Sequence, residues 1–251
     1  IRYSYNALNV AAGLAGQQLQ LHGAYSVDPE SPLLAQPFDR RYTNLTPNVQ
    51  INYEFPNNVW FNLDYNYNVE APQLNDLQPV PNVNNPAFQT EGNPNLNPAR
   101  SHAVGMNINH WNPATFANFG IGMDYSSYDE QIVYNQIIEG IKTITRPVNT
   151  SGGQRFNTYL WSNFPLVKTK LTMNLGGNVN LGNTPAFVNN DKNDTRNLGY
   201  SVNLGFNITP SPKLIVDLRG NIGFNHIKYS IDERQNQDIQ NHSVRVTTKW
   251  Q

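Results

Sequence analysis

The sequence predicts an all-β protein, specifically an antiparallel up-and-down transmembrane β-barrel, on three observations. Side chains alternate between apolar and polar along many segments, which places them on opposite faces of a strand. The segments run for a dozen residues or more, beyond the roughly 5–6 that soluble strands favour. Short and long connections alternate between them, as they do in outer-membrane barrels.

Composition agrees with such a wall. Hydrophobic residues make up 38% and charged residues 14% of the 251 residues, both below the roughly 45–50% and 25% of globular domains. Aromatic residues at 11% and a net charge of -1 argue against disorder. The mean hydropathy is -0.56, and no run approaches the roughly 20 apolar residues of a membrane-spanning helix. Barrel strands need only about 9–11 residues, every second one apolar.

Several function classes are disfavoured. The chain has no cysteine, so disulfides and thiolate metal sites are absent, and the balanced charge predicts no nucleic-acid partner. Its five histidines lack the close spacings of a metal site. The acidic stretches 191–194 and 232–233 lack the ligand order of a calcium loop. We find no catalytic motif, and predict no enzymatic activity, catalytic residue, metal or cofactor.

The first strands are expected from a strand-like start at Ile1–Tyr5 onward. Alternation is clearest around residues 59–70, where Phe61, Leu63 and Tyr65 oppose Asn62 and Asp64. The predicted strands in this half are 1–6, 9–27, 41–55, 59–71, 101–112 and 115–128.

The later strands repeat this alternation, except where Tyr159, Leu160 and Trp161 follow one another. In 196–208, for example, Val202 and Leu204 oppose Asn203. The predicted strands in this half are 152–164, 168–182, 196–208, 213–229 and 241–250. We expect essentially no helix, and strands that pair antiparallel with their sequence neighbours only, because lipid offers no partner to unpaired backbone groups.

The connections favour a barrel over a soluble sheet with one wet face, which has no reason to sort its loops by length. The predicted short turns carry Pro and Asn and lie at 56–58, 112–114, 165–167 and 209–212. The predicted long loops lie at 28–40, 72–100, 129–151, 183–195 and 230–241.

The barrel interpretation predicts the positions of two sets of side chains. Charges that would face lipid at mid-depth cost roughly 2–4 kcal/mol for Arg or Lys, so charged residues of the polar face are expected in the lumen, where they select a solute, contact a plug or only pair across strands. These lumen candidates are Asp64, Lys170, Asp217, Arg219, Arg245 and Lys249. Aromatic residues near strand ends fit interfacial girdles: Tyr53, Trp60, Trp111, Tyr125, Tyr128, Trp161 and Trp250.

Residues 43–111 carry an ordered series of motifs. Thr43–Pro47 leads to Tyr53-Glu-Phe55, then to Leu63-Asp-Tyr65 with Ala71-Pro72, and finally to Glu91-Gly-Asn-Pro-Asn-Leu-Asn-Pro98. The series resembles the C-terminal barrel half of TonB-dependent receptors, particularly the outer-membrane barrel family abundant in Bacteroidota. The loop motif comprises Gly92, Asn93, Pro94, Leu96 and Pro98. The chain departs from the family after it, with Asn97-Pro98-Ala99-Arg100 in place of Lys-Pro-Glu.

The resemblance implies a barrel of 22 strands in the bacterial outer membrane, of which residues 1–251 supply ten or eleven. The plug domain, the TonB box, the first barrel half and the final strands then lie outside this sequence, and no signal peptide is seen in it. We therefore expect residues 1–6 not to pair with 241–250, and both edges to be completed from outside these residues.

The implied function is TonB-dependent uptake of a scarce solute such as a siderophore, glycan or peptide. The partners are outer-membrane lipid, the rest of the barrel and plug, TonB and that extracellular solute. Alternatives are a passive porin or plugless barrel, and a structural or assembly subunit that binds a surface lipoprotein or other complex subunits.

Overall fold

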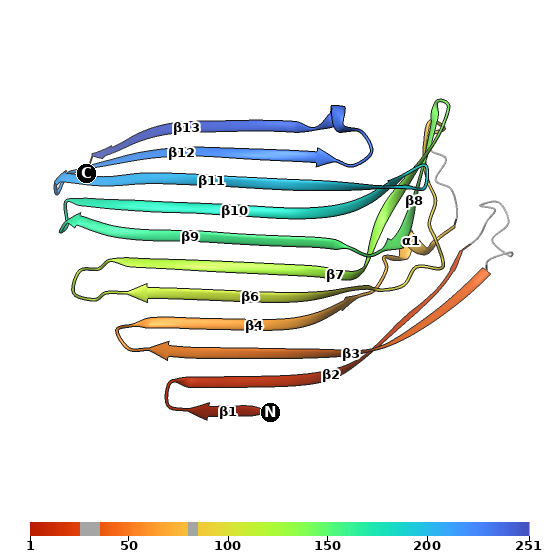
Figure 1. Ribbon diagram of the computed structural model, residues 1–251, viewed down its shortest axis with the longest axis horizontal. Coiled ribbons are helices and arrows are strands. Elements are labelled where there is room, and N and C mark those ends of the chain that lie inside the picture. The colour runs from red at the N-terminus through yellow and green to blue at the C-terminus, as the bar shows by residue number, and fades with distance from the viewer. Residues whose placement is uncertain (26–35, 80–84, 251) are drawn as a thin grey trace.

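The computed structural model describes residues 1–25, 36–79 and 85–250. Eleven strands form a continuous wall in which each strand hydrogen-bonds to the next along the list (Figure 1). In order they are β1 (Arg2–Tyr5), β2 (Leu8–Tyr25), β3 (Gln36–Phe55), β4 (Val59–Glu70), β6 (Ala99–Trp111), β7 (Asn118–Glu139), β9 (Gly153–Val167), β10 (Leu171–Val188), β11 (Asp191–Ser211), β12 (Leu214–Tyr229) and β13 (Gln237–Trp250). The predicted fold class and the upper strand count are confirmed.

Four smaller elements lie among the long connections. They are α1 (Leu74–Leu77), β5 (Phe88–Thr90), β8 (Lys142–Thr150) and the 3-10 helix η2 (Glu233–Gln235). Short turns gather at one end of the wall, while α1 and β8 lie at the other (Figure 1). In the described ranges, no helix has the length and apolar character needed to cross a membrane.

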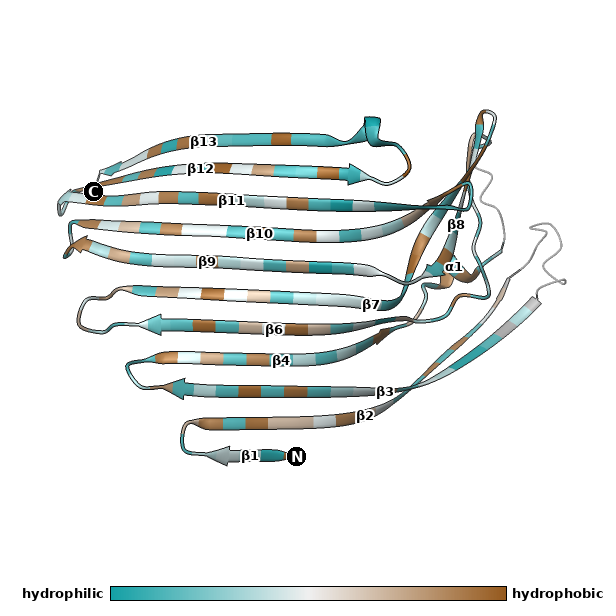
Figure 2. Cartoon of the chain, in the orientation of Figure 1, coloured by the Kyte–Doolittle hydropathy of each residue, from teal (hydrophilic) through white to brown (hydrophobic). Residues whose placement is uncertain are grey.

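Side-chain alternation gives the wall two different faces. One row crosses eight strands and runs through Ile51, Leu63, Met106, Met123, Thr158, Val179, Tyr200 and Phe224. The neighbouring row, one residue away on each strand, runs through Gln50, Asp64, Gly105, Asp124, Asn157, Asn180, Gly199 and Asn225. Figure 2 shows the resulting bands of apolar and polar residues along the strands. A shift of one residue would invert the faces of a strand.

The apolar face has no second layer packed on it in the described structure. Val202 is 50% exposed and Leu204 is 41% exposed, and the only buried hydrophobic side chains in the described ranges are Leu77, Leu96 and Val133, all outside this face. A soluble sheet would bury such a face against another layer. An exposed apolar surface of this extent fits contact with lipid.

The height of the apolar band agrees with a membrane. On β10 the band runs from Leu171 to Leu181, ten residues apart, which is about 33 Å at about 3.3 Å per residue. A strand tilt of about 40°, usual in such barrels, reduces this to about 25 Å, the height of the apolar band of outer-membrane barrels.

The predicted pairing is wrong in two places, both at the end with the long connections. β5 runs parallel to β8, and β10 forms a short parallel contact with β7 through Phe187 and Val188. Moreover, two predicted long loops are ordered hairpins. Residues 131–139 of β7 pair with β8, and β10 pairs with β11 up to a turn at Asn189–Asn190.

Three of the predicted short turns are displaced. The second, predicted at 112–114, extends over residues 112–117, and the last, predicted at 209–212, consists of residues 212–213. The third was predicted at 165–167 but lies at 168–170, because β9 continues through Pro165. A register shift between Leu171 and Thr172 accommodates that proline, which cannot donate to the ladder.

Within the described residues, β1 and β13 are the two ends of the strand order. β1 pairs with β2 and β13 pairs with β12. The expectation that residues 1–6 and 241–250 do not form a common ladder is therefore confirmed. That outside residues complete both edges stays a prediction.

Candidate functional site

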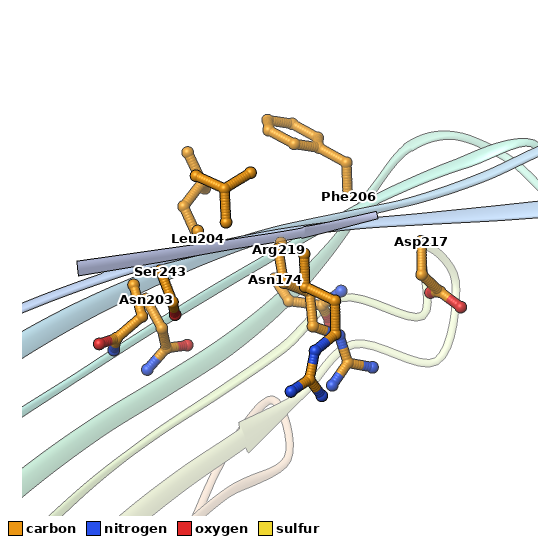
Figure 3. A pocket seen from close by; sticks show the side chains of 12 residues that line it. Asn174, Asn203, Leu204, Phe206, Asp217, Arg219 and Ser243 are labelled. Carbon is orange, nitrogen blue, oxygen red and sulfur yellow. The ribbon is translucent and has the colours of Figure 1, made fainter. Parts of the chain in front are cut away.

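Two arginines face each other on the polar side of the wall. Arg219 of β12 lies directly opposite Arg245 of β13. Both line a cavity of about 630 Å³, whose polar lining comes from β10 to β13: Asn174, Asn203, Asp217, Asn221 and Ser243. In Figure 3, Arg219 and Asn203 point to one side of the strands, whereas Leu204 and Phe206 point to the other.

The arginine patch, which we define as Arg219, Arg245 and the polar side chains that line this cavity with them, holds two cations and one carboxylate, that of Asp217. Neither Arg219 nor Arg245 forms an ion pair or a side-chain hydrogen bond with another described residue, and the Asp217 carboxylate instead accepts a hydrogen bond from Asn207 Nδ2 at 2.9 Å. Like charges directly opposite each other are unfavourable. Two guanidinium groups with free donors suit an anion such as a carboxylate, which arginine binds bidentately.

The second candidate region is the loop layer, which we define as α1, β5, residues 91–98, β8 and residues 131–139 of β7. Residues 91–98 link several elements of it to the wall. Glu91 N donates to Thr145 O on β8 at 3.0 Å, and Asn93 N donates to Asp76 O on α1. Tyr42 of β3 donates its hydroxyl to Leu96 O at 2.9 Å. The segment thus joins β3, α1 and β8.

Glycine is required at the start of this segment by close packing. Gly92 N donates to Gln78 O at 2.9 Å. A Cβ at position 92 would lie 2.4 Å from that same oxygen and 2.8 Å from Asp76 O, both backbone atoms. Leu77, Leu96 and Pro98 are each less than 2% exposed. The loop layer therefore has a small core of its own.

Asparagine side chains connect the loop layer to the β10–β11 hairpin through hydrogen bonds. Asn135 of β7 is 4% exposed, and its Nδ2 donates to Asn190 Oδ1 at 2.7 Å. Its Oδ1 accepts from Asn190 N at 3.2 Å. Ile138 N donates to Asn189 Oδ1 at 2.8 Å. The β7–β8 and β10–β11 hairpins are consequently held together by side-chain amides.

A second polar cavity, of about 600 Å³, opens within the loop layer. Its lining includes Gln73, Asp76, Gln78, Glu91 and Tyr134. Tyr134 donates its hydroxyl to Asp76 Oδ1 at 3.2 Å, while Glu91 pairs with Arg146 at 2.6 Å. Burial raises the pKa of the Tyr134 hydroxyl, and the nearby Asp76 carboxylate adds to this rise. The cavity offers amide, hydroxyl and carboxylate groups to a polar solute.

Comparison with known proteins shows whether the sheet belongs to a soluble protein or to a membrane barrel. A sequence model of the outer membrane protein beta-barrel family matches residues 1–233. The chain belongs to the outer membrane protein beta-barrel family. No curated protein sequence matches it.

Among solved structures, this barrel chain is similar to the siderophore receptor PirA from Pseudomonas aeruginosa, with a TM-score of 0.57 and 12% sequence identity. The match covers 97% of this chain and 48% of that one, so the chain spans about half the length of that structure. At this identity the two share the fold. The barrel lies in the bacterial outer membrane, as predicted.

Within this family fold, the structure brings some of the lumen candidates together. Asp217, Arg219 and Arg245 share the arginine patch, and Lys249 lies on the same face of β13, opposite Ile215. Asp64 lies on the same face of the wall, but on β4, beside Gly105. Lys170 does not lie on the wall as predicted. It belongs to the 168–170 turn, because its strand begins only at Leu171.

The girdle prediction for the barrel is wrong for four of its seven aromatic residues. Register places Tyr53, Tyr125 and Trp250 on the apolar face. It places Trp60, Trp111, Tyr128 and Trp161 on the polar face. Trp161 lies opposite Gly120, and Tyr159 opposite Gly122, so a missing side chain leaves room for each ring. Proximity to a strand end does not tell the face on which an aromatic residue lies.

In the described ranges, no three His, Asp or Glu side chains form a group that could hold a metal ion. Asn221 and Ser243 of the arginine patch are uncharged and were therefore not among the predicted lumen candidates, although they alternate with apolar residues on their strands. Their position beside the two arginines depends on the pairing of β12 with β13, which the sequence of a single strand does not reveal.

Proposed function

We propose that this barrel is part of a receptor that takes up a scarce solute across the outer membrane in a TonB-dependent manner. The arginine patch carries the proposal, because it holds two guanidinium groups that have no direct ion-pair partner among the described residues. On the water-facing side of a wall, such groups form a selective contact for an anionic group on a solute. The likeness in fold to a siderophore receptor supports it.

The route that we propose begins outside the cell. The solute first meets the polar cavity of the loop layer, where Gln73, Gln78 and Tyr134 can form hydrogen bonds. It then passes to Arg219 and Arg245, which retain its carboxylate or other anionic group. A plug energised by TonB, outside these residues, completes the transfer. Siderophores and acidic glycans or peptides have the required chemistry.

Uptake by the full protein, expressed in cells with and without TonB, tests this proposal. We expect uptake of the solute to require TonB and to fall about a hundredfold or more in the double variant Arg219→Gln/Arg245→Gln, because each of the two lost charge-assisted contacts weakens binding by roughly 1.5–3 kcal/mol. Radiolabelled siderophores, acidic oligosaccharides and peptides would serve as probes.

The control is Lys168→Gln/Lys213→Gln, which removes two positive charges from turns of the same wall; uptake should stay at the wild-type level. Uptake that persists without TonB would contradict the proposal and favour a passive porin. Absence of uptake for all probes, together with stoichiometric co-purification of a lipoprotein, would favour a structural subunit.

A further inference from the structure

The apolar face carries a charged boundary on the strands β9 to β12, at the strand ends nearest the loop layer. The last apolar row there runs through Phe156, Leu181, Leu198 and ends at His226. The row two residues further along, on the same face, consists of Gln154, Asn183, Arg196 and Lys228. The apolar surface of these strands thus ends beside two cationic side chains, Arg196 and Lys228.

These two rows line one shallow groove of about 730 Å³ on the lipid-facing side. Tyr125, Phe156, Leu181 and Leu198 form its apolar part, and Arg196 and Lys228 lie at its charged end. The groove therefore combines a surface for an acyl chain with donors for an anionic group, within one feature of the barrel.

Arg196 and Lys228 have no ion-pair partner among the described residues. Arg196 lies directly opposite Lys228, and neither forms an ion pair or side-chain hydrogen bond with another described residue. Asp238 also lines the groove, where it pairs with His226, and Asp194 pairs with Lys192 at 3.6 Å. Neither carboxylate pairs with Arg196 or Lys228. Opposed like charges are unfavourable unless an anion lies between them.

The depth of the pair indicates the source of that anion. Arg196 is the first residue of this face beyond the apolar band on β11, which ends at Leu198. The band has the height of the hydrocarbon layer, about 25 Å, and the pair lies on the side of the loop layer. It is therefore at the headgroup level of the outer leaflet, where basic side chains attract anionic lipid.

We infer that Arg196 and Lys228 bind the phosphate of an anionic lipid of the outer leaflet, whose acyl chains cover Phe156, Leu181 and Leu198. Asn183 and Gln154 supply further hydrogen bonds to the polar headgroup. The site faces away from the lumen and is independent of the transport proposed above, so either proposal can fail without the other.

Lipid retention by the full protein tests this inference. The protein would be purified in detergent and incubated with vesicles of phosphatidylcholine that contain either diphosphorylated or dephosphorylated lipid A, and bound lipid would be measured by native mass spectrometry. We expect the phosphorylated lipid to be retained by wild type, and Arg196→Gln/Lys228→Gln to bind it about thirtyfold more weakly, since each basic residue contributes about tenfold or less at a lipid surface.

Arg219→Gln/Arg245→Gln is the matched control, because it removes two opposed cations from the other face of the same sheet. Its lipid binding should equal that of wild type. Equal retention of both lipids, or unchanged binding in Arg196→Gln/Lys228→Gln, would overturn the inference. Displacement by equimolar inorganic phosphate would do so too, since the site would then recognise the free ion. Should the double variant not fold, Lys228→Gln alone, at an exposed position, gives the same comparison with a smaller expected loss.

Discussion

Arginine at position 202 is expected to destabilise the folded barrel by about 2–4 kcal/mol, the cost of a cation at mid-depth on a lipid-facing wall. Val202 of β11 lies on the apolar face, paired with Gly177 and Ile222. The band on this strand extends from Leu198 to Ile208, so position 202 is close to its middle. An arginine there cannot reach either headgroup region without distorting the wall.

The neighbouring substitution Ser201→Arg is the control, because residue 201 points to the polar face beside Asn178 and Gly223. It should change stability by less than about 1 kcal/mol, since the side chain enters water. Both free energies would be measured by urea titration of the full protein folded into lipid vesicles. Equal costs at the two positions, or a larger cost at 201, would contradict the assignment of faces.

Alanine at position 92 should open the loop layer, with a local cost of about 3 kcal/mol, at the upper end of the usual range for overpacking. The added Cβ would meet backbone atoms of Gln78 and Asp76, which cannot rotate away as a side chain could. The hydrogen bonds from Gly92 N to Gln78 O and from Asn93 N to Asp76 O would also be lost.

Hydrogen exchange of the full protein measures that opening. We expect faster exchange in residues 73–79, 88–98 and 142–150, and unchanged exchange in the wall strands, which do not depend on this contact. Gly16→Ala is the control, because a Cβ at position 16 would meet nothing within 4 Å. Protection of the loop layer equal to that of wild type would show that Gly92 has no such packing role.

The wall could be predicted from the sequence because its physical signal is local. Leu63 against Asp64, or Leu204 against Asn203, records which face of a strand meets water, and the register of the structure keeps that division across the sheet. Turn positions were less certain. Proline at 165 indicated a turn, yet a register irregularity allows β9 to continue through it.

The loop layer could not be predicted in the same way. Its stability comes from contacts between distant segments, such as Arg40 Nη2 with Pro94 O at 2.9 Å and Asn149 Oδ1 with Asn97 N at 2.8 Å. The Gly92–Pro98 motif was found only as a family resemblance, and its packing role required the fold. The arginine patch likewise depends on the connection through η2, whose length does not fix the register of β13.

The assignment of faces is tested most directly by cysteine accessibility along β11, in the full protein within native outer membranes. Residues 1–251 contain no cysteine, so single substitutions at positions 202, 203, 204 and 205 introduce the only thiol of this part of the barrel. We expect cysteines at 202 and 204 to react with a lipid-restricted maleimide, and those at 203 and 205 to react with a water-soluble one. The opposite pattern, or equal labelling by both reagents at all four positions, would contradict a wall with lipid on the leucine side and water on the asparagine side.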